Sequence, residues 1–225
     1  MWPDIRSRPV LLMTLTPFET RLYEQLTPFF SAYGYNLLPE KRQYRLTTPT
    51  GFQNVLLSPA YYGTETVLDV NFGCRHDQIE QIAQQFLNNL SGYRADANTL
   101  VLSIGKFSGQ LYARYTIDTE HELANVCGQI QDFFVETGFP FLNETTTLPA
   151  LDRLLNQFPN EPCRYVYNQA HRYYKGLIAA YLSHDPQADA LTDIYRQQLV
   201  QQTQNPHAQF HFERLVNFLH HYSAN

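Results

Sequence analysis

The first clear pattern along the chain is a run of apolar residues spaced three or four positions apart. This spacing places them on one stripe of a helix, and it predicts a helix over residues 16–33. Thr16, Pro17 and Glu19 form a start signal, because the hydroxyl can cap the helix, proline suits its first turn and the carboxylate can reach back to the cap. Gly34 is expected to end the helix in a left-handed conformation. The apolar positions of the stripe are Leu22, Leu26, Phe29, Phe30 and Tyr33.

Beyond residue 42 the pattern changes to alternation of apolar and polar residues, which is typical of strands with one solvent-facing side. Three such segments, at 43–47, 52–57 and 67–72, predict an antiparallel three-strand meander. Two later segments, 100–104 and 111–117, are joined through a glycine-containing turn. They predict a hairpin.

Helical spacing returns twice among these strands. Asp77 and Glu80 have the spacing of a capping pair, and the apolar residues that follow predict a helix there. Thr119 and Glu122 predict the start of another helix, which Gly138 is expected to close. Strands grouped before and between helices, without regular strand–helix alternation, indicate an antiparallel sheet rather than a parallel one.

The predicted fold class is therefore α+β, with an antiparallel sheet of about five strands, helices on one face of it, and an all-helical C-terminal region. Residues 1–15 are interpreted as a loosely ordered leader, 16–142 as the α+β domain and 143–225 as the helical region packed on it. The C-terminal helices are expected at about 148–158, 164–183, 186–203 and 206–222, with Asp185 and Asn205 as caps before proline.

Composition narrows the functional classes. The chain is 44% hydrophobic and 14% aromatic, so it can bury a substantial core, and its formal net charge is −5. Its 16 Lys and Arg residues are scattered, which disfavours nucleic acid as a partner. Three widely spaced cysteines are typical of a reducing compartment, and the sequence has neither a secretory signal nor an apolar run that could span a membrane. A cytoplasmic protein is expected.

Arg75 and His76 are candidate ligand-binding residues, because they lie where a strand is predicted to run into a helix. Unsatisfied backbone N–H groups and the helix dipole favour an anion at such a place. Asp77 can cap the same helix from within the chain, and this is the alternative interpretation.

The helix predicted over 164–183 carries two neighbouring apolar stripes, which is too wide a face for a helix lying on a single surface. One stripe includes Tyr167, His171 and Tyr174, whose polar tips suit a ligand-binding groove between the sheet and the helical region. Ordinary packing in the seam between those two parts is the commoner use of such a stripe.

No metal or other cofactor is predicted. His207 and His211 have the spacing of two metal ligands on a helix, but Glu213 points elsewhere and two histidines do not complete a site. The sequence also lacks a phosphate-binding loop, dinucleotide-binding glycines, a nucleophile elbow and an HExxH motif. Catalytic residues are therefore not assigned, and catalysis is the less favoured class.

Four short runs carry a family resemblance, namely 34–35, 41–46, 51–55 and 70–73. They resemble bacterial proteins described only as domains of unknown function, in which a first helix ends in a Gly-aromatic pair and leads to a hairpin with an aromatic-Arg pair. Some of those proteins look like neighbours of toxin systems. The resemblance covers about the first half of the chain, implies a bacterial cytoplasmic protein, and transfers no functional residue.

Two functional hypotheses follow. The first is a non-catalytic interaction protein, with an immunity-type role as one form, that holds a protein partner on an acidic and aromatic surface. The second is an enzyme or small-ligand-binding protein with a groove between the sheet and the helical region.

Overall fold

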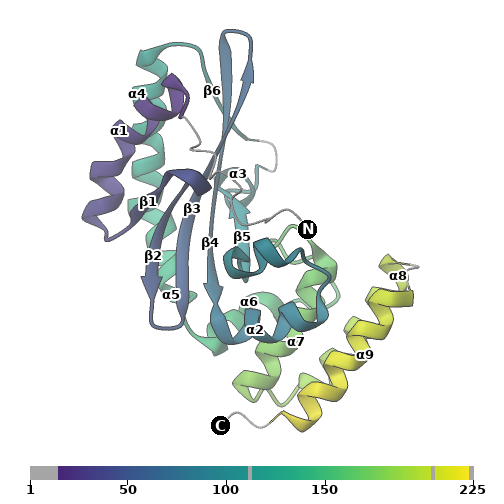
Figure 1. Ribbon diagram of the computed structural model, residues 1–225. Helices are drawn as coiled ribbons and strands as arrows, with labels where there is room; N and C mark the ends of the chain where they lie inside the picture. Colours follow the sequence, from purple (N-terminus) through teal and green to yellow (C-terminus); the bar gives the residue numbers. More distant parts are fainter. Residues whose placement is uncertain (1–14, 111–112, 204–205, 223–225) are drawn as a thin grey trace, which may run out of the picture.

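The computed structural model describes residues 15–110, 113–203 and 206–222 (Figure 1). It is an α+β protein built on an antiparallel sheet, and the predicted fold class is confirmed. The strands are β1 Asn36–Leu38, β2 Gln43–Thr48, β3 Gly51–Tyr62, β4 Glu65–His76, β5 Leu100–Ser103 and β6 Tyr115–Ile117. The α-helices are α1 Pro17–Ala32, α2 Asp77–Phe86, α3 Ile104–Phe107, α4 Glu120–Phe133, α5 Phe139–Glu144, α6 Leu148–Asn156, α7 Gln169–Ser183, α8 Ala188–Gln202 and α9 Pro206–His221. Two 3-10 turns, η1 Pro39–Lys41 and η2 Ser91–Asp96, and a π-helical turn, η3 Phe134–Gly138, complete the elements.

The start of α1 follows the prediction. Thr16 caps the helix by accepting a hydrogen bond from the backbone N–H of Glu19, and the Glu19 carboxylate accepts one from the backbone N–H of Thr16. Gly34 follows the helix with a φ of +83°, a conformation that glycine adopts without strain. Thr119 likewise caps α4 by accepting a hydrogen bond from the N–H of Glu122.

The core lies between the sheet and the helices on one of its faces, where α1 and α4 run side by side (Figure 1). Phe30 of α1 stacks on Tyr44 of β2 with ring centroids 4.5 Å apart, and Phe72 of β4 meets Phe134 at 5.7 Å. All four side chains are almost inaccessible to solvent. Aromatic rings therefore account for much of the packing between the helices and the sheet.

The strand expected over 52–57 continues through Pro59 to Tyr62 as one arm of a long β3–β4 hairpin. Proline is tolerated at position 59 because no β2 residue lies opposite it to accept a backbone hydrogen bond. The N–H of Leu57 donates outward to the carbonyl of Arg42, and the next residue facing the same way is Pro59. Strand β2 begins at Gln43 and does not reach that far, so the missing N–H of proline removes no ladder hydrogen bond.

The hairpin predicted between 100–104 and 111–117 is wrong. After β5 the chain turns into α3, which Ser103 caps by accepting a hydrogen bond from the N–H of Lys106. Strand β6 then pairs with β4 instead of β5. Both β5 and β6 lie along the same edge of β4, and neither of them pairs with Asp69 or Val70. The edge of the sheet therefore forks at these two residues.

Gly138 does not close the helix that begins at Thr119. The chain continues through η3 into α5, and Gly138 has a helical φ of −65°. A Cβ atom at this position would lie only 2.6 Å from Cδ1 of Phe134, so glycine is required for close packing rather than for a left-handed stop. Pro140 is the second residue of α5, directly after the π-helical turn.

The C-terminal region is helical, as predicted, although two helices begin later than expected. Asn168 caps α7, and α8 starts at Ala188 rather than at Pro186. Residues 1–14, Leu111 and Asn205, on which earlier predictions depend, lie outside the described residues. The domain division at residue 142 stays a prediction. Across the described ranges, none of the helices combines the length and the apolarity that a membrane span requires.

Candidate functional site

Arg75 and His76 lie at the junction of β4 and α2. The Arg75 guanidinium is turned toward its own protein, because Nε donates to Oδ1 of Asp77 at 2.6 Å and Nη1 donates to two backbone carbonyl oxygens. The predicted capping pair of Asp77 and Glu80 is wrong, since Asp77 lies in the first helical turn and Glu80 is buried. His76 holds the cap position without a side-chain cap, and burial lowers the pKa of its imidazole. Arg75 therefore holds the junction together, whereas Nδ1 of the buried His76 ring has no hydrogen-bond partner among the described residues.

A buried ion pair joins α2 to α7 beneath this junction. Nζ of Lys175 lies 2.9 Å from Oε1 of Glu80, and the two side chains are 7% and 0% exposed. The Thr99 hydroxyl donates to the same carboxylate oxygen, and Nε2 of Gln84 donates to the other one. Lys175 also donates to the carbonyl of Asn98. The carboxylate and the ammonium are therefore both hydrogen-bonded, which is what makes a buried charge pair tolerable.

Sequence reasoning missed this pair because Glu80 has the spacing of a helix cap. Two signals pointed to it. Glu80 lies among the apolar positions of its helix, and Lys175 interrupts an apolar helix that was predicted to be covered on two sides. Charges at such positions are seldom buried unless they are paired.

His171 and Tyr174 line a hollow of about 400 Å³ between α2, α7 and α9. Tyr174 is 3% exposed, its hydroxyl donates to the carbonyl of Ala208 at 2.7 Å, and its ring meets Phe212 edge-on at 5.4 Å. Burial lowers the pKa of His171, and the nearby Lys175 ammonium acts in the same direction. Both effects favour the neutral form of His171, and Tyr174 is a packed residue between α7 and α9.

The other histidines of this hollow, His207 and His211, come from α9. Glu213, which follows them, is directed toward α8, where its carboxylate accepts hydrogen bonds from Arg196 at 2.6 and 3.1 Å. Within the part of the chain that the structure describes, no three His, Cys, Asp or Glu side chains are placed to hold a metal ion together.

Tyr167, the remaining predicted residue, precedes α7 and reaches back to the sheet. It is 55% exposed, and its hydroxyl donates to Oδ1 of Asn71 at 2.6 Å. It forms one wall of a hollow of about 410 Å³ beside the fork in the sheet. We call this hollow the fork crevice, and its polar lining consists of Asp69, Asn71, Ser103, Lys106, Arg114 and Tyr167.

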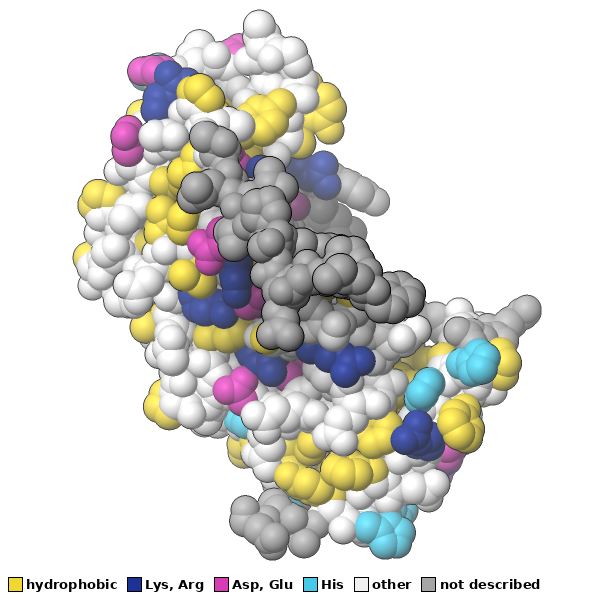
Figure 2. Space-filling model, viewed as in Figure 1, with side chains coloured by type: hydrophobic (Ala, Val, Ile, Leu, Met, Phe, Trp, Pro, Cys, Tyr) yellow, Lys and Arg dark blue, Asp and Glu magenta, His cyan; other side chains and the backbone are white. Residues whose placement is uncertain are grey.

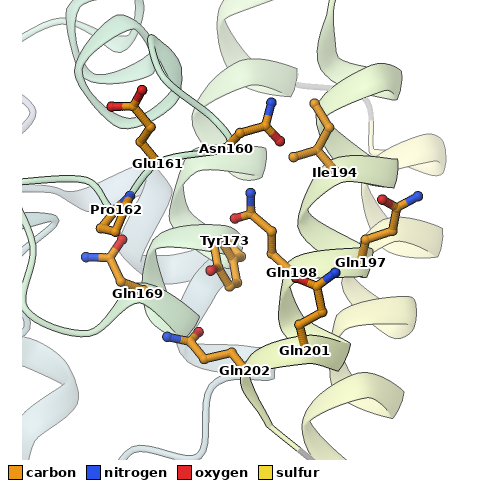
Figure 3. Close-up of a pocket in the computed structure, with 10 residues that line it drawn as sticks. All are labelled: Asn160, Glu161, Pro162, Gln169, Tyr173, Ile194, Gln197, Gln198, Gln201 and Gln202. Carbon is orange, nitrogen blue, oxygen red and sulfur yellow. The ribbon is translucent and has the colours of Figure 1, made fainter.

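A third hollow, also of about 410 Å³, lies between α8 and the loop that connects α6 to α7 (Figure 3). Carboxamide side chains dominate its lining. Two of them hold the protein's own loop, because Gln169 exchanges hydrogen bonds with the backbone of Cys163 and Gln198 donates to the carbonyl of Pro159. Buried Arg172 donates to the loop carbonyls of Phe158 and Glu161 and to that of Leu155 in α6. Part of the polar lining of this cleft therefore serves to anchor the loop.

At the end of the molecule where α1 and α4 begin, the β3 arm of the β3–β4 hairpin runs on past β2, while β6 accompanies the β4 arm up to Thr66 (Figure 1). Tyr61 and Tyr62, near its tip, are 46% and 63% exposed. Phe18 packs edge-on against Tyr61 with centroids 6.1 Å apart. Hydrophobic and acidic side chains are both visible at this end (Figure 2). We define the hairpin-tip surface as Phe18, Tyr61, Tyr62, Glu65, Asp118, Glu120 and Glu122.

The carboxylates of this surface are close enough to influence one another. A hydrogen bond to Glu122 and repulsion from Glu122 and Glu65 raise the pKa of Asp118. Glu120 alone of the four forms an ion pair with a described residue, Arg21, at 2.5 Å. The surface therefore carries more negative charge than its own cations neutralise.

Comparison with known proteins identifies no relative: no family model, no curated protein and no solved structure matches this chain.

The five predicted ligand-binding residues lie in three places in the structure. Arg75 and His76 are at the β4–α2 junction, Tyr167 is at the fork crevice, and His171 and Tyr174 line the hollow beside α9.

Proposed function

We propose that this chain acts by binding a protein partner rather than by catalysis, and that the hairpin-tip surface is where the partner binds. The observation that carries the proposal is the end of the hairpin, which presents Tyr61 and Tyr62 to solvent beside four carboxylates. Exposed aromatic side chains supply much of the binding free energy at protein interfaces. A hollow of about 340 Å³ between Phe18, Tyr61 and Leu123 offers a place for one partner side chain.

Charge complementarity indicates a partner with a basic surface. Glu65, Asp118 and Glu122 have no described cation in ion-pair contact, so an incoming Lys or Arg would relieve their mutual repulsion. Nucleic acid would be repelled from the same surface. An immunity-type role, in which the partner is a toxin with such a basic face, is the finer form of this proposal.

A cytoplasmic location is part of the proposal. Cys74, Cys127 and Cys163 are free and buried, and burial raises the pKa of Cys74 and of Cys127 to about 11. Buried thiols of this kind act as small apolar side chains and are not poised for redox chemistry. A reducing compartment suits them.

The test is affinity capture from a lysate of the source organism with three forms of the protein. The tip variant combines Tyr62→Ser with Glu65→Lys. The control variant is Tyr93→Ser, which alters another exposed tyrosine (71% against 63% for Tyr62) on η2. We expect a basic protein that the wild type and the control retain and the tip variant loses, with at least a tenfold weaker affinity once it is purified. Its affinity for the wild type should fall as salt is raised. Equal recovery of every captured protein by the tip variant would contradict the proposal.

A further inference from the structure

The fork crevice contains Lys106, one of the few lysines of this chain. The chain has three lysines. Lys41 pairs with Asp96 at 2.8 Å and Lys175 pairs with Glu80 at 2.9 Å. No carboxylate of the described residues lies in ion-pair contact with Lys106.

Lys106 is nevertheless held firmly in place. Its Nζ donates to the carbonyl of Val166 at 2.6 Å and lies 4.6 Å from the centroid of the Tyr167 ring. Burial lowers the pKa of Lys106, because a half-buried ammonium is stabilised less by water than an exposed one. The Val166 carbonyl accepts one N–H bond of the ammonium, and the Tyr167 ring covers one side of it. Its other N–H bonds remain available for a ligand.

The rest of the crevice adds hydrogen-bond donors. Arg114 forms no ion pair with a described residue, and its guanidinium carries five donors. The Ser103 hydroxyl already accepts from the backbone N–H of Lys106, so its own proton is free to be donated. Asn71 uses its carbonyl oxygen to accept from Tyr167, which leaves its amide nitrogen as a donor. Donors thus come from β4, β5, α3 and the loop before β6.

Asp69 is the one carboxylate in the lining, and it restricts the ligand. For a ligand with a single negatively charged group, attraction to Lys106 and Arg114 exceeds repulsion by Asp69. A large polyanion would be repelled. The unpaired edge of β4 at Asp69 and Val70 leaves the crevice open between β5 and β6. A volume of about 410 Å³ falls in the range of small-molecule sites.

We propose that the fork crevice binds the carboxylate or phosphate group of a metabolite-sized molecule through Lys106 and Arg114, with Ser103 and Asn71 as further donors. This site is separate from the hairpin-tip surface, and it does not depend on the protein-binding proposal.

The test uses pyridoxal 5′-phosphate as a phosphate-bearing probe. Its aldehyde condenses with a lysine amine to form an imine and water, and borohydride reduction fixes the label for peptide mapping. With only three lysines, two of them in ion pairs, the site of labelling is easily read. Inorganic phosphate and succinate are the competitors, each compared with sodium chloride at the same ionic strength, and melting temperatures are recorded in parallel.

We expect Lys106 to be labelled ahead of Lys41 and Lys175, and at least one competitor to slow that labelling about fivefold or more while leaving Lys41 unaffected. Protection by phosphate alone, by succinate alone or by both identifies the group that is bound. Arg114→Gln should weaken the protection at least fivefold. Arg153→Gln, which changes an exposed arginine on α6, should not. Labelling of Lys106 that neither anion slows, with melting temperatures unchanged by both, would overturn the proposal, and so would full protection in Arg114→Gln.

Discussion

The seam between α2 and α7 and the hairpin-tip surface both contain carboxylates, but they treat them in opposite ways. In the seam, Glu80 has a lysine and two hydrogen-bond donors of its own chain around it, and it is completely buried. At the tip, Glu65, Asp118 and Glu122 face solvent and one another. A charge that the fold pairs and hydrogen-bonds internally can be buried between its elements. A charge left without a partner remains available for a second molecule.

Breaking the seam should produce the largest loss of stability. Lys175→Met leaves the Glu80 carboxylate buried without its counter-ion, and we expect a loss of about 3–5 kcal/mol in the free energy of unfolding. Denaturant titration measures it. The control is the double variant Glu80→Gln/Lys175→Met, which removes both charges and should lose less than the single variant. A loss below about 1 kcal/mol for Lys175→Met would show that the pair contributes little to the fold.

A buried tyrosine of α7 and an exposed tyrosine of the hairpin tip should differ in the same direction as the carboxylates. Tyr174→Ala removes a buried ring that packs on Phe212, and we expect a loss of about 3–5 kcal/mol. Tyr62→Ala removes an exposed ring and should change stability by less than about 0.5 kcal/mol. Both are read from denaturant midpoints. A shift for Tyr174→Ala as small as that of Tyr62→Ala would instead assign Tyr174 to an open groove.

The smallest effect on stability is expected from the interactions among the carboxylates of the hairpin-tip surface. Because the pKa of Asp118 is raised, the folded state holds this proton more tightly than the unfolded chain. Its contribution to stability is therefore present at low pH and is lost as pH rises through the folded pKa. Glu122→Gln removes the main cause but keeps a side chain that can serve the cap of α4, so the pKa of Asp118 should fall toward its ordinary value.

Carboxyl NMR titration of the full chain measures this change. Glu120→Gln is the matched control, because Glu120 is not among the groups that raise the pKa of Asp118. A pKa of Asp118 that stays the same in Glu122→Gln would mean that the tip carboxylates do not interact, and it would weaken the argument that a cation is needed there.

The features that the sequence predicted well are those that depend on residues close together along the chain. The caps of α1 and α4 involve residues three positions apart, so their spacing is sufficient to identify them. The extension of β3 through Pro59 depends on where β2 begins, and the pairing of β6 with β4 depends on the turn at α3. The pattern of residues along the chain does not predict the extension of β3 or the pairing of β6, because both depend on which other strand lies alongside.

The candidate sites show the same limit. Tyr167 was identified as a polar tip on an apolar helix, but the crevice that it lines also needs Lys106 and Arg114, which lie more than fifty residues earlier. Glu80 was interpreted as a cap because a capping residue and a buried acid can have the same spacing from the helix start. Only the proximity of Lys175, ninety-five positions later, distinguishes the two.

Pro59 has a consequence for how these molecules behave toward one another. The outer edge of the hairpin beyond Leu57 has no neighbour among the described strands, and such edges are templates on which a second copy can add its own strand. Proline at this position offers a carbonyl but no N–H, so a copy that approaches edge to edge cannot form a continuous ladder. The hairpin can extend into solvent, with its tyrosines exposed, while this edge is protected against open-ended polymerisation at high concentration.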